Sequence, residues 1–284
     1  MTHTLLKLLA SALILSCSAC SSGYPVRVDN VITGSGQPIE QVRLVGRALA
    51  LEVVNDAMID LQLTVSVGLE PALLVSADSN LLPMIHSEMS GSTLKIRVDD
   101  NVRSSHKIKI LYSTNQLERL AVRRSGTVTV NGLDGGALTV DNAGSANVAL
   151  SGKLDQLKLA SNGSGRFDAR ALTSKNATVR MDGAGQVDAG RLAGSTLQVD
   201  VNGSGKFTAS GIVRKLDATI NGSGQIDLAS LVSETATLSS NGAGSIMAKV
   251  QHEVQPRTTG SGSIRIQGAP TVARSSGSRI TYVP

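Results

Sequence analysis

The second half of the chain alternates between apolar and polar residues in short runs that recur at a fixed interval. Two residues after each recurring glycine lies an apolar residue, another lies four residues after it, and the residues between are mostly polar. The first of these columns comprises Val128, Val148, Phe167, Val187, Phe207, Ile226, Ile246 and Ile264. A second alternating run, such as Leu197, Val199 and Val201, precedes each glycine pair. Alternation with a period of two predicts strands that bury one face, and no unit shows the 3.6-residue period of a helix.

A four-residue phrase, Asn-Gly-Ser-Gly or a close variant, separates the two strands of each unit. Its glycines are Gly163, Gly165, Gly183, Gly185, Gly203, Gly205, Gly222, Gly224, Gly242, Gly244, Gly260 and Gly262. A weaker version ends at Ala146, and the last residues of successive phrases are 18 to 20 positions apart. A fixed period of this size marks a repeat architecture in which each unit stacks on the previous one. The sequence therefore predicts an all-β protein, a parallel β-solenoid with coils of about 20 residues and columns about 4.8 Å apart.

The glycines suit the corners of such coils. A corner needs positive φ, which glycine adopts without strain, and a preceding Asn or Asp can bond the local backbone. A phosphate-binding loop would be followed by a helix, whereas a strand follows here. A calcium-binding repeat would recur about every nine residues with an Asp in each turn. Both alternatives are disfavoured.

The first half of the chain lacks the glycine phrase. Residues 20–40 read as a flexible tether, and strands are expected near 42–46, 48–54, 60–67, 72–76, 94–98 and 107–112. Residues 81–89 are ambiguous, because Pro83 interrupts a run that could form a strand or a single helical turn. We expect one domain over 41–284, with irregular coils to about 115 and regular coils from about 116 to 270. A separate first β-domain is the alternative.

Residues 1–19 have the character of a signal peptide. Lys7 precedes a short apolar run, Leu8 to Leu15, and small residues then lead to Cys20. Cys20 is the preferred lipidation site and Cys17 the alternative. Plain secretion with cleavage near Ala19, or an uncleaved anchor, stays open. Both cysteines of the chain lie here, so the body has no disulfide, cysteine metal site or cysteine nucleophile.

Composition and charge limit the classes of partner that the chain is expected to bind. The formal net charge is +5, but basic residues are dispersed, aromatic residues make up 2% of the chain, and tryptophan is absent. Stacking platforms for nucleic-acid bases are therefore missing, and we expect no nucleic-acid partner. His86 and His106 are 20 positions apart and could stack on adjacent coils, but they lack the spacing of a metal site. We expect no metal and no cofactor.

Asp168 and Asp188 carry the sharpest catalytic hypothesis. They occupy equivalent outward positions on consecutive coils, so their carboxylates could lie about 5 Å apart, which suits two-carboxylate glycoside chemistry. Arg166 and Lys206 lie nearby in an outward column. The next coil has Thr208 in the aspartate position, and no aromatic column is present to hold a sugar. A solvated polar face is the favoured interpretation, and a polysaccharide lyase or glycoside hydrolase is the alternative.

The chain also resembles a known family. Glu40 to Leu44, Leu73 to Pro83, Gly91 to Ile96 and the glycine phrases together are similar to the head GIN domain of auto-transporter adhesins over about residues 38–270. The resemblance implies a right-handed parallel β-helix on an exported bacterial protein, often a lipoprotein, and it brings no catalytic residues. If Cys20 is acylated, the absence of Asp after it resembles sorting to the outer membrane.

Together these observations predict a non-catalytic, adhesin-like protein of the cell envelope. Its partner would be an envelope glycan or another protein, with binding residues that the sequence leaves unknown. The membrane would be reached only through the lipid anchor. The open ends of a solenoid could also pair between subunits and so form homo-oligomers.

Overall fold

The computed structural model describes residues 31–56, 60–104 and 106–283, which belong to one compact unit, residues 31–284. Its first strands are β1 (Ile32–Thr33), β2 (Pro38–Arg43), β3 (Ala50–Asn55), β4 (Leu61–Val67), β5 (Ala72–Asp78), β6 (Ile85–Ser90), β7 (Thr93–Val98), β8 (Val102–Arg103) and β9 (Ile108–Thr114). They are followed by β10 (Arg119–Arg124), β11 (Thr127–Asp134), β12 (Ala137–Gly144), β13 (Asn147–Gly163), β14 (Arg166–Gly183), β15 (Gln186–Gly203), β16 (Lys206–Gly222), β17 (Gln225–Gly242), β18 (Ser245–Gly260), β19 (Ser263–Gln267), β20 (Val272–Ala273) and β21 (Ile280–Val283). Among the described residues the helical element is a single 3-10 turn, η1 (Leu82–Met84).

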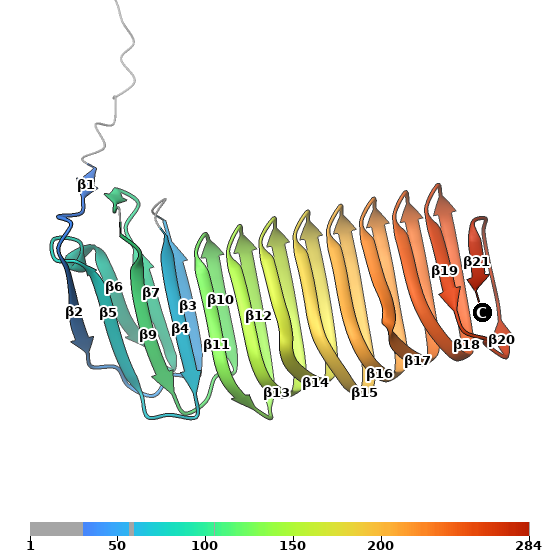
Figure 1. Cartoon of the computed structure of the whole chain (residues 1–284), viewed down its shortest axis with the longest axis horizontal. Helices are drawn as coiled ribbons and strands as arrows, with labels where there is room; N and C mark the ends of the chain where they lie inside the picture. The colour runs from blue at the N-terminus through green and yellow to red at the C-terminus, as the bar shows by residue number, and fades with distance from the viewer. Residues whose placement is uncertain (1–30, 57–59, 105, 284) are drawn as a thin grey trace, which may run out of the picture. The chain divides into compact units, whose positions relative to one another are not determined.

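From β10 onward the coils stack in chain order, as Figure 1 shows. The long strands β13 to β18 each run through most of one coil and pair in parallel with the strands before and after. Equivalent positions of the repeat meet in register: Gly163 pairs with Gly183, and Gly183 pairs with Gly203. The predicted all-β solenoid with coils of about 20 residues is confirmed.

The inner wall of the solenoid is mostly aliphatic, and it also contains the rings of Tyr112, Phe167 and Phe207. The column that begins at Val128 and includes Phe167 and Phe207 is buried throughout, and a single hydrophobic cluster extends from Ala48 to Ile266. Among the described residues this apolar cluster and the backbone ladders hold the coils together. The first and second halves of the chain share one core.

The two glycines of each phrase have different reasons to be glycine. Gly163, Gly183, Gly203, Gly222 and Gly242, which come first, have φ between 120° and 131°. The second glycines lie outside this range of φ and are buried. A Cβ on Gly224, for example, would lie 2.8 Å from the carbonyl oxygen of Gly205 on the coil before. The first glycine is required by positive φ as well as by the close approach of successive corners, whereas close approach alone accounts for the second.

The beginning of the solenoid does not follow chain order. The coil made by β3 and β4 lies between the β7/β9 coil and the β10/β11 coil, because β3 pairs in parallel with both β7 and β10, and β4 with both β9 and β11. Beyond β7 and β9 the neighbours are antiparallel: β6 pairs with β7, β5 with β9, and β2 with β5. The chain reverses there, so β2 and β6 become the terminal strands of the two faces.

In the first half of the chain, the secondary structure of two segments can be compared with the sequence prediction. The ambiguous segment 81–89 contains both alternatives, the η1 turn around Pro83 and then β6. Residues 31–40, assigned to the tether from sequence, contribute β1, which pairs with β8, and the start of β2. No helix in the described part of the chain is long and apolar enough to cross a membrane.

Candidate functional site

Two rows of polar side chains run along one outward face of the regular coils. The amide-basic row comprises Asn147, Arg166, Gln186, Lys206 and Gln225, which pair in register on β13 to β17. The acidic row comprises Asp168, Asp188, Thr208 and Asp227, also in register. Side chains of the first row are exposed and those of the second are half-buried. Because strand pairing is parallel and nearly unshifted here, hydrogen-bonding groups repeat at the interstrand spacing of about 4.8 Å.

Asp168 and Asp188 are neighbours, but their environments differ from those of a catalytic pair. Asp168 accepts from Arg170, with the Nε atom 2.9 Å from Oδ1 and Nη2 2.5 Å from Oδ2. This hydrogen bond is the largest cause that lowers the pKa of Asp168 to about 2, and the charges of Arg170 and Arg166 act in the same direction. Asp188 accepts from the backbone N–H of Gly190 at 2.9 Å. A general acid needs a raised carboxyl pKa, and Asp168 has the opposite shift.

The face is hollowed only slightly around these residues. A depression of about 170 Å³ is lined by Arg166, Phe167, Gln186, Val187, Asp188, Lys206 and Thr208. Pockets that enclose small ligands are typically about 300–1,000 Å³. The shape suits contact with one side of a long ligand better than enclosure of a small one.

At the glycine corners the Asn and Asp side chains bond one another along the solenoid. The amide nitrogen of Asn202 donates to Asp182 at 2.7 Å, that of Asn221 to Asn202 at 2.8 Å, and that of Asn241 to Asn221 at 3.0 Å. The series ends on the carboxylate of Asp182, which also accepts a hydrogen bond from Arg180. The hydrogen bond from Arg180 is the largest cause that lowers the pKa of Asp182, and the hydrogen bond from Asn202 is the next. From the sequence, these side chains are expected to bond the local backbone, whereas in the structure they bond one another between coils. Asn recurs in one column of the repeat, and this recurrence is the sequence signal that predicts a ladder of side-chain hydrogen bonds between coils.

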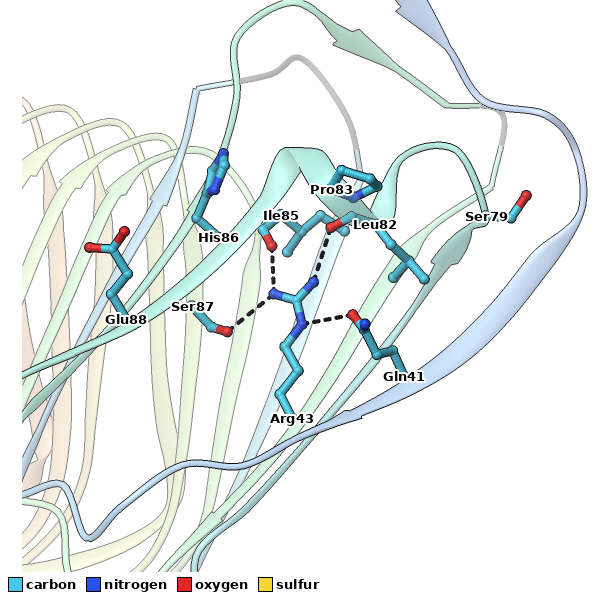
Figure 2. A pocket seen from close by; sticks show the side chains of 9 residues that line it. All are labelled: Gln41, Arg43, Ser79, Leu82, Pro83, Ile85, His86, Ser87 and Glu88. Atoms are coloured by element: carbon cyan, nitrogen blue, oxygen red, sulfur yellow. Dashed lines mark hydrogen bonds between the residues drawn. The ribbon is translucent and has the colours of Figure 1, made fainter.

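A larger depression, about 550 Å³, lies at the β2/β6 end, and Figure 2 shows Arg43 at its centre. The Arg43 guanidinium donates to the carbonyl oxygens of Leu82 (3.0 Å) and Ile85 (2.5 Å), to Ser87 Oγ (3.1 Å) and to Gln41 Oε1 (3.0 Å). Burial lowers the pKa of Arg43. With its donors directed at η1 and β6, Arg43 ties the two faces together at the end of the solenoid. Nothing in the sequence distinguished it from other arginines.

The histidines do not stack. His86 Nε2 lies 3.0 Å from Asp99, and His106 Nδ1 lies 3.3 Å from the buried Asp78, so each imidazole contacts a different carboxylate. Within the described residues no three His, Cys, Asp or Glu side chains are placed to hold a metal ion. Cys17 and Cys20 lie outside the described residues.

Comparison with known proteins places the chain in a family. The family model "Putative auto-transporter adhesin, head GIN domain" matches residues 56–191 and 175–270. The chain belongs to this family. The resemblance seen in the sequence is thereby confirmed. A comparison with curated proteins gave no match.

Solved structures of several bacterial proteins share the fold. A "putative adhesin" from Parabacteroides merdae has a TM-score of 0.65 at 16% identity, covering 90% of this chain and 100% of its own. A "putative lipid binding protein" from Parabacteroides distasonis has a TM-score of 0.61 at 22% identity, covering 89% and 99%. A "putative adhesin" from the same species has a TM-score of 0.62 at 16% identity, covering 89% and 99%. At these identities the likeness extends to the fold alone.

Proposed function

We propose that this chain is an exported, non-catalytic binding protein of the cell envelope that holds an extended glycan along the amide-basic and acidic rows. The observation that carries the proposal is the register of these rows, over five coils for the amide-basic row and four for the acidic row. An extended glycan presents hydroxyl groups at each sugar, and amide, carboxylate and cationic side chains at a regular spacing can bond several sugars in succession. Membership of the adhesin family supports an exported, adhesin-like role.

The charges of the site favour binding over catalysis. The ion pair with Arg170 keeps Asp168 ionised, since its pKa is about 2. An ionised carboxylate accepts hydrogen bonds from sugar hydroxyls but cannot donate a proton to a leaving group. The small volume of the depression supports the same function, because a chain-cleaving enzyme must surround the bond that it breaks.

Binding is tested with residues 31–284 on an array of neutral and anionic glycans and on whole bacterial cells. We expect binding that is weakened by the double variant Arg166→Glu, Lys206→Glu. The matched control is Lys215→Glu, an exposed lysine in a different row of the same coil as Lys206. Equal loss in the control, or no binding to any glycan, contradicts the proposed site.

The enzyme alternative has its own measurement. The same glycans are incubated with the protein and examined for new reducing ends or unsaturated products. We expect none. Product formation that disappears in Asp188→Asn would replace a binding function with a lyase or hydrolase function.

We further propose that the protein is tethered to the outer membrane by a lipid on Cys20, with periplasmic or surface exposure of the solenoid. The signal-like residues 1–19 and the small residues before Cys20 support this attachment. Labelled palmitate should be incorporated into the full chain, and Cys20→Ser should abolish incorporation. Incorporation that persists in Cys20→Ser and is lost in Cys17→Ser assigns the lipid to Cys17, and a mature protein without lipid removes the anchor.

A further inference from the structure

Exposed apolar side chains gather where the outward acidic row reaches the β2 end of the solenoid. From Asp168 toward the β2 end, the residues that pair in this row are first Ala149, Thr129 and Thr64. The row then continues with three apolar residues, Leu111, Leu74 and Val42. Leu111 is 51% exposed and Val42 is 74% exposed. Leu44, which immediately follows β2, is fully exposed. The last three strands of this face therefore carry an apolar surface, which we call the end patch (Val42, Leu44, Leu74 and Leu111).

The end patch adjoins an unpaired strand edge. Among the described residues β2 pairs with β5 alone, and five of its six residues are exposed. The N–H of Ser79 donates to the carbonyl of Gln37, which makes Gln37 and Ser79 a hydrogen-bonded pair of this antiparallel ladder. Hydrogen-bonded and non-bonded pairs alternate, so residues 39, 41 and 43 bond β5. Glu40 and Val42 therefore direct their backbone N–H and C=O groups away from the sheet.

This edge has few of the features that prevent strand addition. Natural edge strands are usually blocked by charged side chains (especially lysines), prolines, bulges or covering loops. Of these features, β2 has Pro38 at its first position and Glu40. β2 has no lysine and pairs with β5 without a bulge, and its inward-pointing Arg43 is already engaged by the carbonyls of Leu82 and Ile85. Figure 1 shows β2 as the outermost strand of the solenoid. Its two charged side chains, Glu40 and Arg43, cancel, so two copies of the strand can approach without net repulsion.

We infer that β2 is a self-association edge, and that a second copy of this chain pairs with it antiparallel about a two-fold axis at Gln41. In this register Glu40 lies opposite Val42 of the second copy, and Pro38 lies opposite its Leu44. Glu40 and Val42 both face the free edge, so each Glu40–Val42 pair exchanges two backbone hydrogen bonds. Pro38 lacks an N–H and accepts only. A pairing centred one residue later would place Gly46 opposite Pro38 and so extend the ladder three residues beyond Arg43, the last residue of β2.

A second copy fits the surface better than a bilayer does. The apolar character covers only three strands, and the row becomes Thr64 and Thr129 and then reaches Asp168 and Asp188. A flat bilayer on this face would bring those carboxylates toward the lipid, which is unfavourable. Strand pairing involves only the end of the solenoid and joins the end patches of the two copies into one apolar surface.

The oligomeric state of residues 31–284, which contain the whole core, tests the inference. We expect a dimer by light scattering at high micromolar concentration. Val42→Lys adds an exposed lysine to the edge and should raise the dimer dissociation constant at least tenfold. Ile212→Lys, at an exposed apolar residue far along the solenoid, is the matched control and should leave the dimer intact. A monomer in the unmodified protein, or a dimer that survives Val42→Lys, overturns the inference.

Cysteine cross-linking tests the register, because residues 31–284 contain no cysteine. Opposed residues of a non-hydrogen-bonded antiparallel pair have Cα atoms about 4.5 Å apart, within the range of a disulfide. Gln41→Cys should therefore form a disulfide-linked dimer under mild oxidation, and Ser223→Cys, on an exposed corner, should not. Absence of the Gln41→Cys cross-link contradicts the proposed axis. A monomer that binds phosphatidylcholine vesicles through Val42 overturns self-association in favour of a membrane contact.

Discussion

Replacing Gly222 by alanine tests the physical basis of the solenoid corners. Gly222 has a φ of 131°, and a Cβ there would lie 2.5 Å from the carbonyl oxygen of Gly203 on the coil before. Holding a residue with a side chain in such a conformation costs about 1–3 kcal/mol. Relieving the overlap with backbone costs a further 1–3 kcal/mol, roughly. We therefore expect Gly222→Ala to lower the free energy of unfolding by about 2–6 kcal/mol.

The assay is urea unfolding followed by circular dichroism for three variants of one corner. Gly224→Ala should cost only the steric part, about 1–3 kcal/mol, because its φ lies outside the positive range. Ser223→Ala, at an exposed position between the glycines, should change stability by less than about 0.5 kcal/mol. Because repeat proteins can unfold in parts, amide hydrogen exchange around the corner is measured in parallel. If Gly222→Ala is as stable as Ser223→Ala, the reasoning about positive φ is wrong.

Three further outcomes are expected. Asn221→Ala removes one donated and one accepted hydrogen bond of the ladder and should lower the free energy of unfolding by about 0.5–1.5 kcal/mol in the same urea assay. Asn162 lies in the same column but has no side-chain hydrogen bond among the described residues, so Asn162→Ala should lower it by less. Because the folded pKa of Asp168 lies below its unfolded value of about 3.9, its pairing with Arg170 stabilises the fold above about pH 4, and this contribution is lost as the pH falls toward 2. Arg170→Gln should move the pKa of Asp168 upward in a carboxyl NMR titration, and an unchanged value would show that Arg170 is not the cause. Phe207→Ala should cost about 3–5 kcal/mol in thermal or urea unfolding because the ring is fully buried, and a loss below 1 kcal/mol would indicate that the coils collapse around the gap.

The sequence determined the regular coils because each strand, corner and buried column there is encoded locally and repeated. The alternation around Val187 or Phe207 fixes which side chains face inward, and the interval between phrases fixes which residues stack. Asp168 and Asp188 could be placed side by side on this basis alone, and the structure pairs them in register. A period leaves little freedom, because a shift of one residue would turn every apolar side chain outward.

Only the tertiary structure decided the beginning of the solenoid and the chemistry of its surface. The local sequence of β3 and β4 does not predict their neighbours. In the structure, the coil that contains β7 lies on one side of them and the coil that contains β10 lies on the other. The role of Arg43 depends on carbonyls about 40 residues away, and the low pKa of Asp168 depends on which way Arg170 turns. These features arise from contacts between segments whose sequences are independent of one another, so the repeat pattern does not predict them. The free edge of β2 belongs to the same class, since a strand is terminal only when no other strand lies beside it.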